Sequence, residues 1–265
     1  WGYPIAVEAI GLIYNKDLVP TPPATMEEIA EMQIEGVEHP ILWDYNNTYF
    51  TFPLLMAGGG FAFEKVDGAY DPSATGVAND GAKAGGKLLR SFIDGGVMPA
   101  GVNYGVMAAA INKGETAMVI NGPWAWSNLE ASGINFGVAP IPSVDGAPSK
   151  AFVGVLSAAI NAASPNKDLA VEFIENYMLT DDGLRMVNDD VALGAVASKS
   201  FAEEVGTDPK IAGTLANAEA GVPMPSIPEM GKFWAAMEPA LTAITTGTAS
   251  VDDALDGAAD RILAD

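Results

Sequence analysis

The sequence predicts an α/β fold, because apolar runs of strand length alternate with amphipathic segments of helix length, and turns rich in Gly, Pro and Asn separate them. Two of these runs, residues 40–43 and 116–120, end in polar loops that lead into helix-like segments. Open α/β sheets bind ligands where their strands end, so we expect both loops to lie at a binding site.

The loop after residues 116–120 reads Asn121-Gly122-Pro123-Trp124-Ala125-Trp126-Ser127-Asn128. Its Asn-Gly pair is a turn signal, and Pro123 suits the first position of a following helix because the N–H that it lacks would be unpaired there. This predicts a fixed position for Trp124 at the end of a strand, with burial in the core as the alternative. For Trp126 we expect a place in the core, where large aromatic side chains are usually found.

Composition limits the possible partners. The chain has 265 residues, of which 49% are hydrophobic, enough for a core in one large domain or two lobes, and no apolar run has the roughly 18 residues that a membrane span requires. The 13 basic and 34 acidic residues give a net charge of −21, so nucleic acid is not expected as a partner. A charge of this size suppresses self-association, and we expect a monomer.

Several kinds of chemistry lack the residues that they need. The chain has no Cys, which excludes disulfides, thiolate nucleophiles and Cys-based metal sites, and His39 is its only histidine. Without a second His or a Cys, we do not expect His39 to bind a metal or to act as a general base. Residues 58–60 are glycines, but no Lys-Ser or Lys-Thr follows, which argues against a phosphate loop. The sequence predicts no cofactor.

The expected strands are β-branched or alternating runs bounded by turn residues. They are residues 3–9, 11–15, 40–43, 61–65, 116–120, 135–139 and 152–160. Residues 66–69 form a hairpin-like turn. The last run is longer than an ordinary strand, so we expect it to cross between two lobes.

The expected helices begin at capping residues. Thr25 and Glu28 form a capping box, Ser164-Pro165 offers a cap with a proline at the first helical position, and Thr180 and Ser250 are further caps. The predicted helices are residues 25–35, 49–56, 79–93, 104–112, 164–177, 180–188, 199–205, a segment from 208, 229–245 and a segment from 250. Residues 223–228 are expected to be a stiff, extended connector because of their prolines.

Long strings of residues without a simple periodicity very rarely agree with those of a known family by chance. The chain contains several strings of this kind. They are Tyr3-Pro4-Ile5-Ala6-Val7-Glu8-Ala9, Leu12-Ile13-Tyr14-Asn15-Lys16-Asp17-Leu18, Asn112-Lys113-Gly114-Glu115-Thr116-Ala117-Met118, the loop 121–128, Phe152-Val153-Gly154-Val155-Leu156-Ser157-Ala158 and Asn161-Ala162-Ala163-Ser164-Pro165-Asn166-Lys167. From end to end, the chain resembles the periplasmic maltose/maltodextrin-binding proteins of ABC importers.

This resemblance implies a periplasmic binding protein-like fold of two α/β lobes joined by crossing hinge strands. In the family, a signal peptide and most of an N-terminal lobe precede the segment that matches Trp1. We therefore interpret Trp1 as a cut point and expect the C-terminal lobe to be nearly complete and the N-terminal lobe to be mostly absent. The expected division is 1–10 for the end of the N-terminal lobe and a hinge, 11–152 and 209–265 for the C-terminal lobe, 153–157 for a hinge, and 158–208 for a segment of the N-terminal lobe. We expect this last segment to be the least well packed.

The resemblance also implies a sugar site. Glu8 matches a hinge-side carboxylate that accepts hydrogen bonds from sugar hydroxyls, and Tyr49, Trp124 and Trp234 match aromatic platforms that stack on pyranose rings. A sugar has an apolar face of C–H groups and a rim of hydroxyls, so flat rings with a few polar anchors suit it. The expected ligand-binding residues are Glu8, Asn47, Tyr49, Phe50, Tyr104, Trp124, Met224 and Trp234.

Three positions depart from the family's pattern and bear on chain length, linkage and affinity. Asn47-Thr48-Tyr49 stands where the best-known member has an acidic residue before Pro-Tyr. Ala235 stands where an aromatic residue is expected, and Glu238 where a basic one is expected.

The expected function is non-catalytic binding of a maltose/maltodextrin-type oligosaccharide in the periplasm, for delivery to the membrane permease of an ABC importer. One alternative is a glycoside hydrolase, in which Glu8, Asp44 or Glu238 would supply an acid and a nucleophile, although nothing in the sequence fixes two carboxylates across a scissile bond. The other alternative is a chain without measurable binding, since half of the cleft is expected to be absent.

Overall fold

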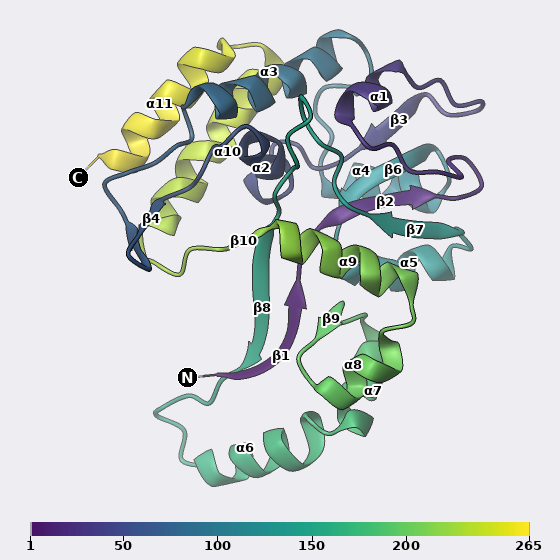
Figure 1. The fold of residues 1–265 in the computed structure, drawn as a ribbon, viewed down its shortest axis with the longest axis vertical. Helices are drawn as coiled ribbons and strands as arrows, with labels where there is room; N and C mark the ends of the chain where they lie inside the picture. The colour runs from purple at the N-terminus through teal and green to yellow at the C-terminus, as the bar shows by residue number, and fades with distance from the viewer. Residues whose placement is uncertain (1, 265) are drawn as a thin grey trace.

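The computed structural model describes residues 2–264, so the interpretation of Trp1 concerns a residue outside the described range. Figure 1 shows a larger upper part and a smaller lower part, joined by the strands β1 (Tyr3–Glu8) and β8 (Phe152–Ala158). The two strands pair antiparallel, with Glu8 opposite Gly154. β8 thus passes from one part to the other, as its length predicted.

The upper part is built on a four-stranded mixed sheet. Its order is β3 (His39–Leu42), β6 (Thr116–Asn121), β2 (Gly11–Asn15) and β7 (Phe136–Ala139). β2 is antiparallel to β6 and β7, whereas β3 is parallel to β6. All positions of β6 are buried, as in a strand that is covered on both faces. Because β3 and β6 are parallel neighbours, the loops that follow them leave the sheet at the same edge.

Helices pack on this sheet and continue to one side of it (Figure 1). They are α1 (Met26–Glu31), α2 (Thr48–Ala57), α3 (Asp80–Asp94), α4 (Tyr104–Asn112), the 3-10 turn η1 (Pro123–Ala125), α5 (Trp126–Ala131), α9 (Pro209–Ala220), α10 (Met230–Thr246) and α11 (Val251–Leu263). On that side, α3 and α10 pack on α2, and α11 packs on α3 and α10. A hairpin of β4 (Glu64–Val66) and β5 (Ala69–Asp71) follows α2. Every residue of α2 except Tyr49 is buried, so this helix lies at the centre of the core.

The capping predictions are confirmed at α1, α7 (Asp181–Asp190) and α11. The Thr25 hydroxyl accepts a hydrogen bond from the Glu28 N–H, and the Glu28 carboxylate accepts one from the Thr25 N–H, which completes the capping box. Thr180 and Ser250 each accept a hydrogen bond from a backbone N–H in the first turn of their helix. Pro123 begins the turn η1, as predicted.

Some predicted boundaries are wrong. α1 ends at Glu31, because Met32 is already extended. α6 (Lys167–Phe173) begins after Pro165, since the Ser164 hydroxyl accepts a hydrogen bond from the Asn166 N–H and forms a turn ahead of the helix. The strand predicted at 61–65 is the later and shorter β4.

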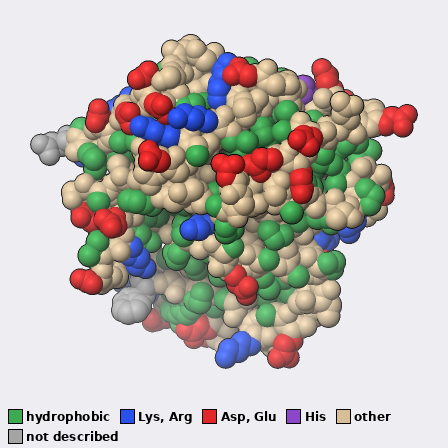
Figure 2. Space-filling view, turned by 45° about the horizontal axis from the view of Figure 1, so that its top comes forward, with side chains coloured by type: hydrophobic (Ala, Val, Ile, Leu, Met, Phe, Trp, Pro, Cys, Tyr) green, Lys and Arg blue, Asp and Glu red, His purple; other side chains and the backbone are tan. Residues whose placement is uncertain are grey.

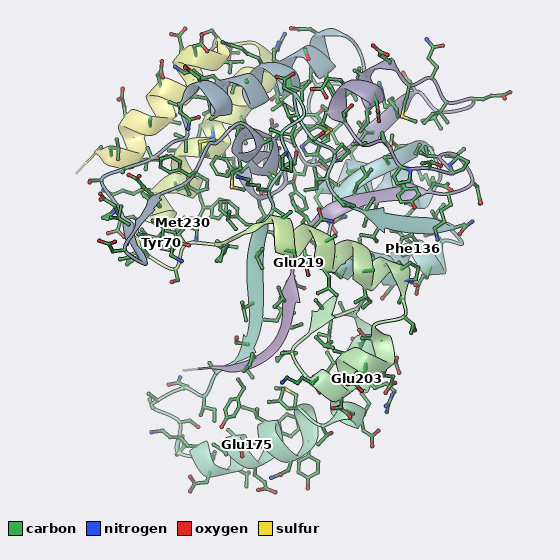
Figure 3. All side chains as sticks on the ribbon, viewed as in Figure 1. Tyr70, Phe136, Glu175, Glu203, Glu219 and Met230 are labelled. Atoms are coloured by element: carbon green, nitrogen blue, oxygen red, sulfur yellow. The ribbon has the colours of Figure 1, made fainter. Side chains whose placement is uncertain are left out.

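The lower part has little core. It contains α6, the π-helical turn η2 (Ile174–Met178), α7, β9 (Ala195–Val196) and α8 (Lys199–Val205), with Glu175 and Glu203 labelled there in Figure 3. β9 and β10 (Val222–Pro223) extend the sheet of the long strands to the order β10-β8-β1-β9. Its buried apolar cluster consists only of Ala6, Leu184, Leu193 and Phe201. Large apolar side chains such as Leu169 and Met186 are 73% and 76% exposed, so this segment is sparsely packed, as expected.

The glycines at 58–60 have a structural role. Gly58 follows α2, and a Cβ added to Gly81 of α3 would lie 1.8 Å from the Gly58 carbonyl oxygen. The absence of side chains thus allows α2 and α3 to approach closely, which explains these glycines without a phosphate.

The surface reflects the composition. On the face shown in Figure 2, Asp and Glu side chains are spread widely and Lys and Arg are fewer, in keeping with the net charge of −21. None of the helices within residues 2–264 has the length and apolar character needed to cross a membrane.

Asn217 joins α9 to the sheet after the chain returns from the lower part. It is only 4% exposed. Its amide nitrogen donates to the carbonyl oxygens of Ala139 and Gly213 at 3.0 and 2.8 Å, and its amide oxygen accepts from the Ile141 N–H at 2.9 Å. The side chain therefore satisfies backbone groups on two elements that are distant in sequence.

We expect Asn217→Ala to lower the free energy of unfolding by about 2–3 kcal/mol, because buried backbone groups lose their partners. Urea unfolding followed by circular dichroism measures this. Glu219→Ala, at an exposed position of the same helix (labelled in Figure 3), is the matched control and should change stability by less than about 0.5 kcal/mol. Equal losses in the two variants would contradict the proposed link.

Candidate functional site

The loops after β3 and β6 bring aromatic residues together at one edge of the upper sheet. Tyr49 and Phe50 lie at the start of α2, Trp124 lies in η1, and Tyr104 begins α4. The ring centroids of Tyr49 and Trp124 are 6.3 Å apart, those of Phe50 and Trp124 are 6.4 Å apart, and those of Phe50 and Tyr104 are 6.0 Å apart. We call these four residues the aromatic cluster.

The members of the aromatic cluster differ in exposure. Tyr104 is 37% exposed, and Tyr49 and Trp124 are half-buried, so each presents part of its ring to solvent. Phe50 is only 6% exposed and meets the rings of Tyr49 and Trp124 edge-on. Phe50, a residue expected from the sequence to line the groove, packs against the exposed rings from the side of the core.

Gly122 fixes the position of Trp124. A Cβ added to Gly122 would lie 2.2 Å from the six-membered ring of Trp124, so the indole lies directly over the glycine backbone. The Asn121 side chain accepts a hydrogen bond from the Gly122 N–H at 2.9 Å and faces the Tyr104 hydroxyl at 3.5 Å. The Asn-Gly turn therefore holds two aromatic side chains of the site.

Trp234 reaches the site from α10. Its ring packs on Phe152 and Phe233, with centroid distances of 5.7 and 4.8 Å. Together with Tyr49 it borders an open depression of about 310 Å³, whose lining is completed by Asn47, Thr48 and Glu238. Tyr49 thus belongs both to the aromatic cluster and to this depression, which joins the two.

Asn47 contributes mainly to the position of α2. Its side-chain oxygen accepts a hydrogen bond from the Tyr49 N–H at 3.0 Å and caps the helix. Thr48, the first residue of α2, is buried, and its hydroxyl has no hydrogen-bond partner. This oxygen is itself shielded from solvent, so Thr48 lines the depression without presenting its hydroxyl to it.

Glu8 and Met224 lie beside β8 at the junction of the two parts. Glu8 is opposite Gly154 on one side of β8, and the Met224 N–H donates to the Val153 carbonyl on the other side. Burial raises the pKa of the Glu8 carboxyl above its ordinary value. Burial, and to a lesser extent the charge of Glu8, raises the pKa of Tyr49 to about 12.

Two further carboxylates belong to the loops and helices of this region. Glu238 lines the depression, and from the sequence it is both a candidate group of a hydrolase and a departure from the family's pattern. Burial raises the pKa of Asp44, the backbone N–H groups of Tyr104 and Asn47 lower it, and the charge of Glu238 raises it. Asp44 lies two residues after the end of β3, so its place in the loop between a strand and a helix was the signal that could have identified it.

The other residues singled out from the sequence lie elsewhere. Trp126 is only 3% exposed, which confirms its place in the core. The Lys210 ammonium lies 5.6 Å from the centroid of its ring. His39 is half-buried in β3, with Nε2 3.9 Å from the exposed Glu38 carboxylate.

Known proteins are similar to this chain in sequence. A family model for bacterial extracellular solute-binding proteins matches residues 1–214. A galactooligosaccharide-binding protein of Bacillus subtilis (strain 168) is 30% identical over 98% of this chain and 64% of its own length. A maltotriose-binding protein of Pyrococcus abyssi is 27% identical over 92% of this chain and 54% of its own length. The maltodextrin-binding protein MdxE of B. subtilis is 24% identical, over 99% and 66%.

The mixed α/β architecture is that of a periplasmic binding protein-like fold. The chain belongs to the family of bacterial extracellular solute-binding proteins. It spans 54–66% of the length of the relatives named above.

Glu8→Gln should make the unliganded protein more stable at pH 7. The pKa of Glu8 is raised in the folded state, so its contribution to stability is complete below the unfolded value of 4.5 and is lost as the pH rises through the folded value. The gain of Glu8→Gln over the wild type should therefore grow between pH 4 and pH 7 in urea unfolding experiments. Glu31→Gln, at an exposed position of α1, is the control. A gain that is independent of pH would contradict burial as the cause.

Proposed function

We propose that this chain carries a surface that binds an oligosaccharide of the maltose/maltodextrin class without catalysing a reaction. The observation that supports this most strongly is the meeting of Tyr49, Trp234 and the carboxylate of Glu238 at one depression, next to the aromatic cluster. Because the chain spans 54–66% of its relatives' length, the proposal concerns the surface formed by these residues.

The chemistry of the site suits a sugar. Half-buried rings offer flat apolar faces to the C–H groups of a pyranose, and carboxylates accept hydrogen bonds from its hydroxyls. Glu8 and Asp44 are held in partly desolvated positions, where a hydrogen bond from a ligand hydroxyl would offset the cost of burying their charge. Met224 would line the side of the site across β8 from Glu8.

The relatives support a sugar ligand and name two classes of it. Maltotriose and maltodextrin appear in the names of two relatives, and galactooligosaccharide in that of a third, which has the higher identity of 30%. A galactooligosaccharide is therefore the second candidate. In either case the chain would act outside the cytoplasmic membrane as a monomer and deliver the sugar to the permease of an ABC importer.

Glycoside hydrolysis finds less support. The relatives named above are binding proteins by name, and no cavity lining described within residues 2–264 brings together two of Glu8, Asp44 and Glu238. Release of new reducing ends from maltodextrin would favour the hydrolase, whereas binding without release would favour transport.

Trp124→Ala should weaken the binding of maltotriose, as followed by tryptophan fluorescence, at least about tenfold, because it removes a ring of the sugar platform while Trp234 can still report binding. Fluorescence titration with maltotriose, maltose and a β-galactooligosaccharide measures affinity and class in one series. Tyr177→Ala, which removes an exposed aromatic side chain from the lower part, is the control and should leave binding intact.

An affinity for maltotriose in Trp124→Ala equal to that of the wild-type chain would contradict the assigned site. Absence of any signal in a folded wild-type chain would contradict binding by this chain alone. Restoring the remaining length of its relatives would then separate an incomplete site from a different ligand.

A further inference from the structure

A cavity of about 420 Å³ lies between the β4–β5 hairpin and the segment that begins with β10. Its lining comes from the end of α2 and the loop after it, from the hairpin, from the start of β8 and from residues 222–225. It shares no residue with the aromatic cluster or with the depression beside Trp234. A volume of this size is within the range of small-molecule sites, so we examined what chemistry its walls offer.

Four aromatic rings line this cavity: those of Phe61, Phe63, Tyr70 and Phe152. Phe63 and Phe152 are only 3% and 1% exposed, so the core holds both of them in place. The Tyr70 hydroxyl donates a hydrogen bond to the Pro223 carbonyl oxygen at 3.1 Å and thereby ties the hairpin to the segment after β10. Figure 3 labels Tyr70 beside that segment. The cavity is therefore preformed and offers flat apolar faces, which suit an aromatic ligand.

Two lysines from distant parts of the sequence contribute to the same lining. Lys65 lies in β4 and Lys150 lies just before β8, whereas Glu64 is the one carboxylate among the described residues of the lining. The Lys65 ammonium lies 5.5 Å from the centroid of the Tyr70 ring, so it stays close to the cavity wall. Neither lysine forms an ion pair within residues 2–264, so both charges are available to a ligand.

This balance of charge is the reverse of that of the whole chain, which has 13 basic and 34 acidic residues. Another cavity, of about 390 Å³ beside α5, α7 and α9, follows the average: four carboxylates line it with a single lysine, Lys210, which already pairs with Glu130 at 2.7 Å. The cavity beside the hairpin thus combines aromatic rings with an excess of positive charge. An anionic group on a flat apolar body is the ligand chemistry that uses both features.

We propose that the cavity beside the hairpin is a second ligand site, which binds a small aromatic carboxylate. The aromatic body of such a ligand packs among the four rings, and its carboxylate accepts hydrogen bonds from the Lys65 and Lys150 ammonium groups. Phe152 also packs on Trp234, with a centroid distance of 5.7 Å, so the two sites share a supporting ring. The proposal goes beyond sugar binding and does not depend on it.

The test uses 4-benzoylbenzoate, an aromatic carboxylate that also bonds covalently to nearby C–H groups under near-ultraviolet light. Its amide, 4-benzoylbenzamide, has the same shape without the charge. Isothermal titration at an ionic strength of about 0.1 M measures both affinities under conditions that screen charges beyond about 10 Å. One pair of opposite charges about 4 Å apart in a water-like dielectric changes affinity about fivefold, so we expect the carboxylate to bind about fivefold more tightly than the amide.

Lys65→Gln and Lys150→Gln each remove one positive charge and keep a polar side chain. Each should reduce the ratio of the two affinities about twofold, and the double variant should bring it close to one, while the affinity for the amide stays unchanged. Lys167→Gln is the matched control, because it removes the same charge from an exposed position on α6 that lines none of the cavities described above. It should leave the ratio unchanged.

Irradiation of the bound carboxylate shows where it lies. Mass spectrometry of the digested chain should find the label in peptides that contain residues 56–70, 150–152 or 222–225, which line the cavity. Label confined to residues 169–187, where large apolar side chains are exposed, would overturn the assignment. Label confined to the aromatic cluster would overturn it as well.

The affinities give independent outcomes. Equal binding of the carboxylate and the amide overturns the proposal, and so does an equal response of Lys65→Gln, Lys150→Gln and Lys167→Gln, because the effect would then come from the net charge of the whole chain. Absence of saturable binding by a chain that circular dichroism shows to be folded also overturns it. No sugar is present in these titrations, so none of these outcomes bears on the proposed function.

Discussion

The parallel pairing of β3 with β6 is the constraint on which the site depends. His39 lies beside Thr116 and Leu42 beside Val119, so both strands end at the same edge of the sheet. The loop after β3 leads to Tyr49, and the loop after β6 leads to Trp124, which places rings from positions 75 residues apart within 6.3 Å. The burial of β6 at every position keeps this edge fixed.

The site combines well-packed supports with poorly solvated charges. Phe50 packs against the Trp124 ring, and Gly122 lies under it. Glu8 and Asp44 are partly removed from water and form no ion pair within the described residues. Groups in this condition cost stability when the site is empty and can regain it through a ligand's hydroxyls. Such a cost to the stability of the empty protein is typical of binding sites. The carboxylates in ion pairs on the rest of the surface do not carry it, because a cation already compensates their charge.

The two parts of the chain differ in how they are held together. The upper part has a continuous core that includes the centre of the sheet and nearly all of α2. The lower part depends on β1, β8 and a small buried apolar cluster, and it leaves several large apolar side chains exposed. Glu8 and Met224 lie beside β8, where the two parts meet, so a ligand bound there touches the strands that join them.

The sequence by itself determined the local features. The capping box at Thr25, the turn at Gly122 and the strand lengths follow from interactions between residues a few positions apart, and the resemblance supplied the sugar-site residues. Only the tertiary structure decided that Phe50 lies beneath the platform, that Asp44 and Glu238 face the same region, and that Asn217 joins α9 to β7. These contacts join positions far apart in the chain, and their distances depend on strand order and helix packing, which local propensity does not encode.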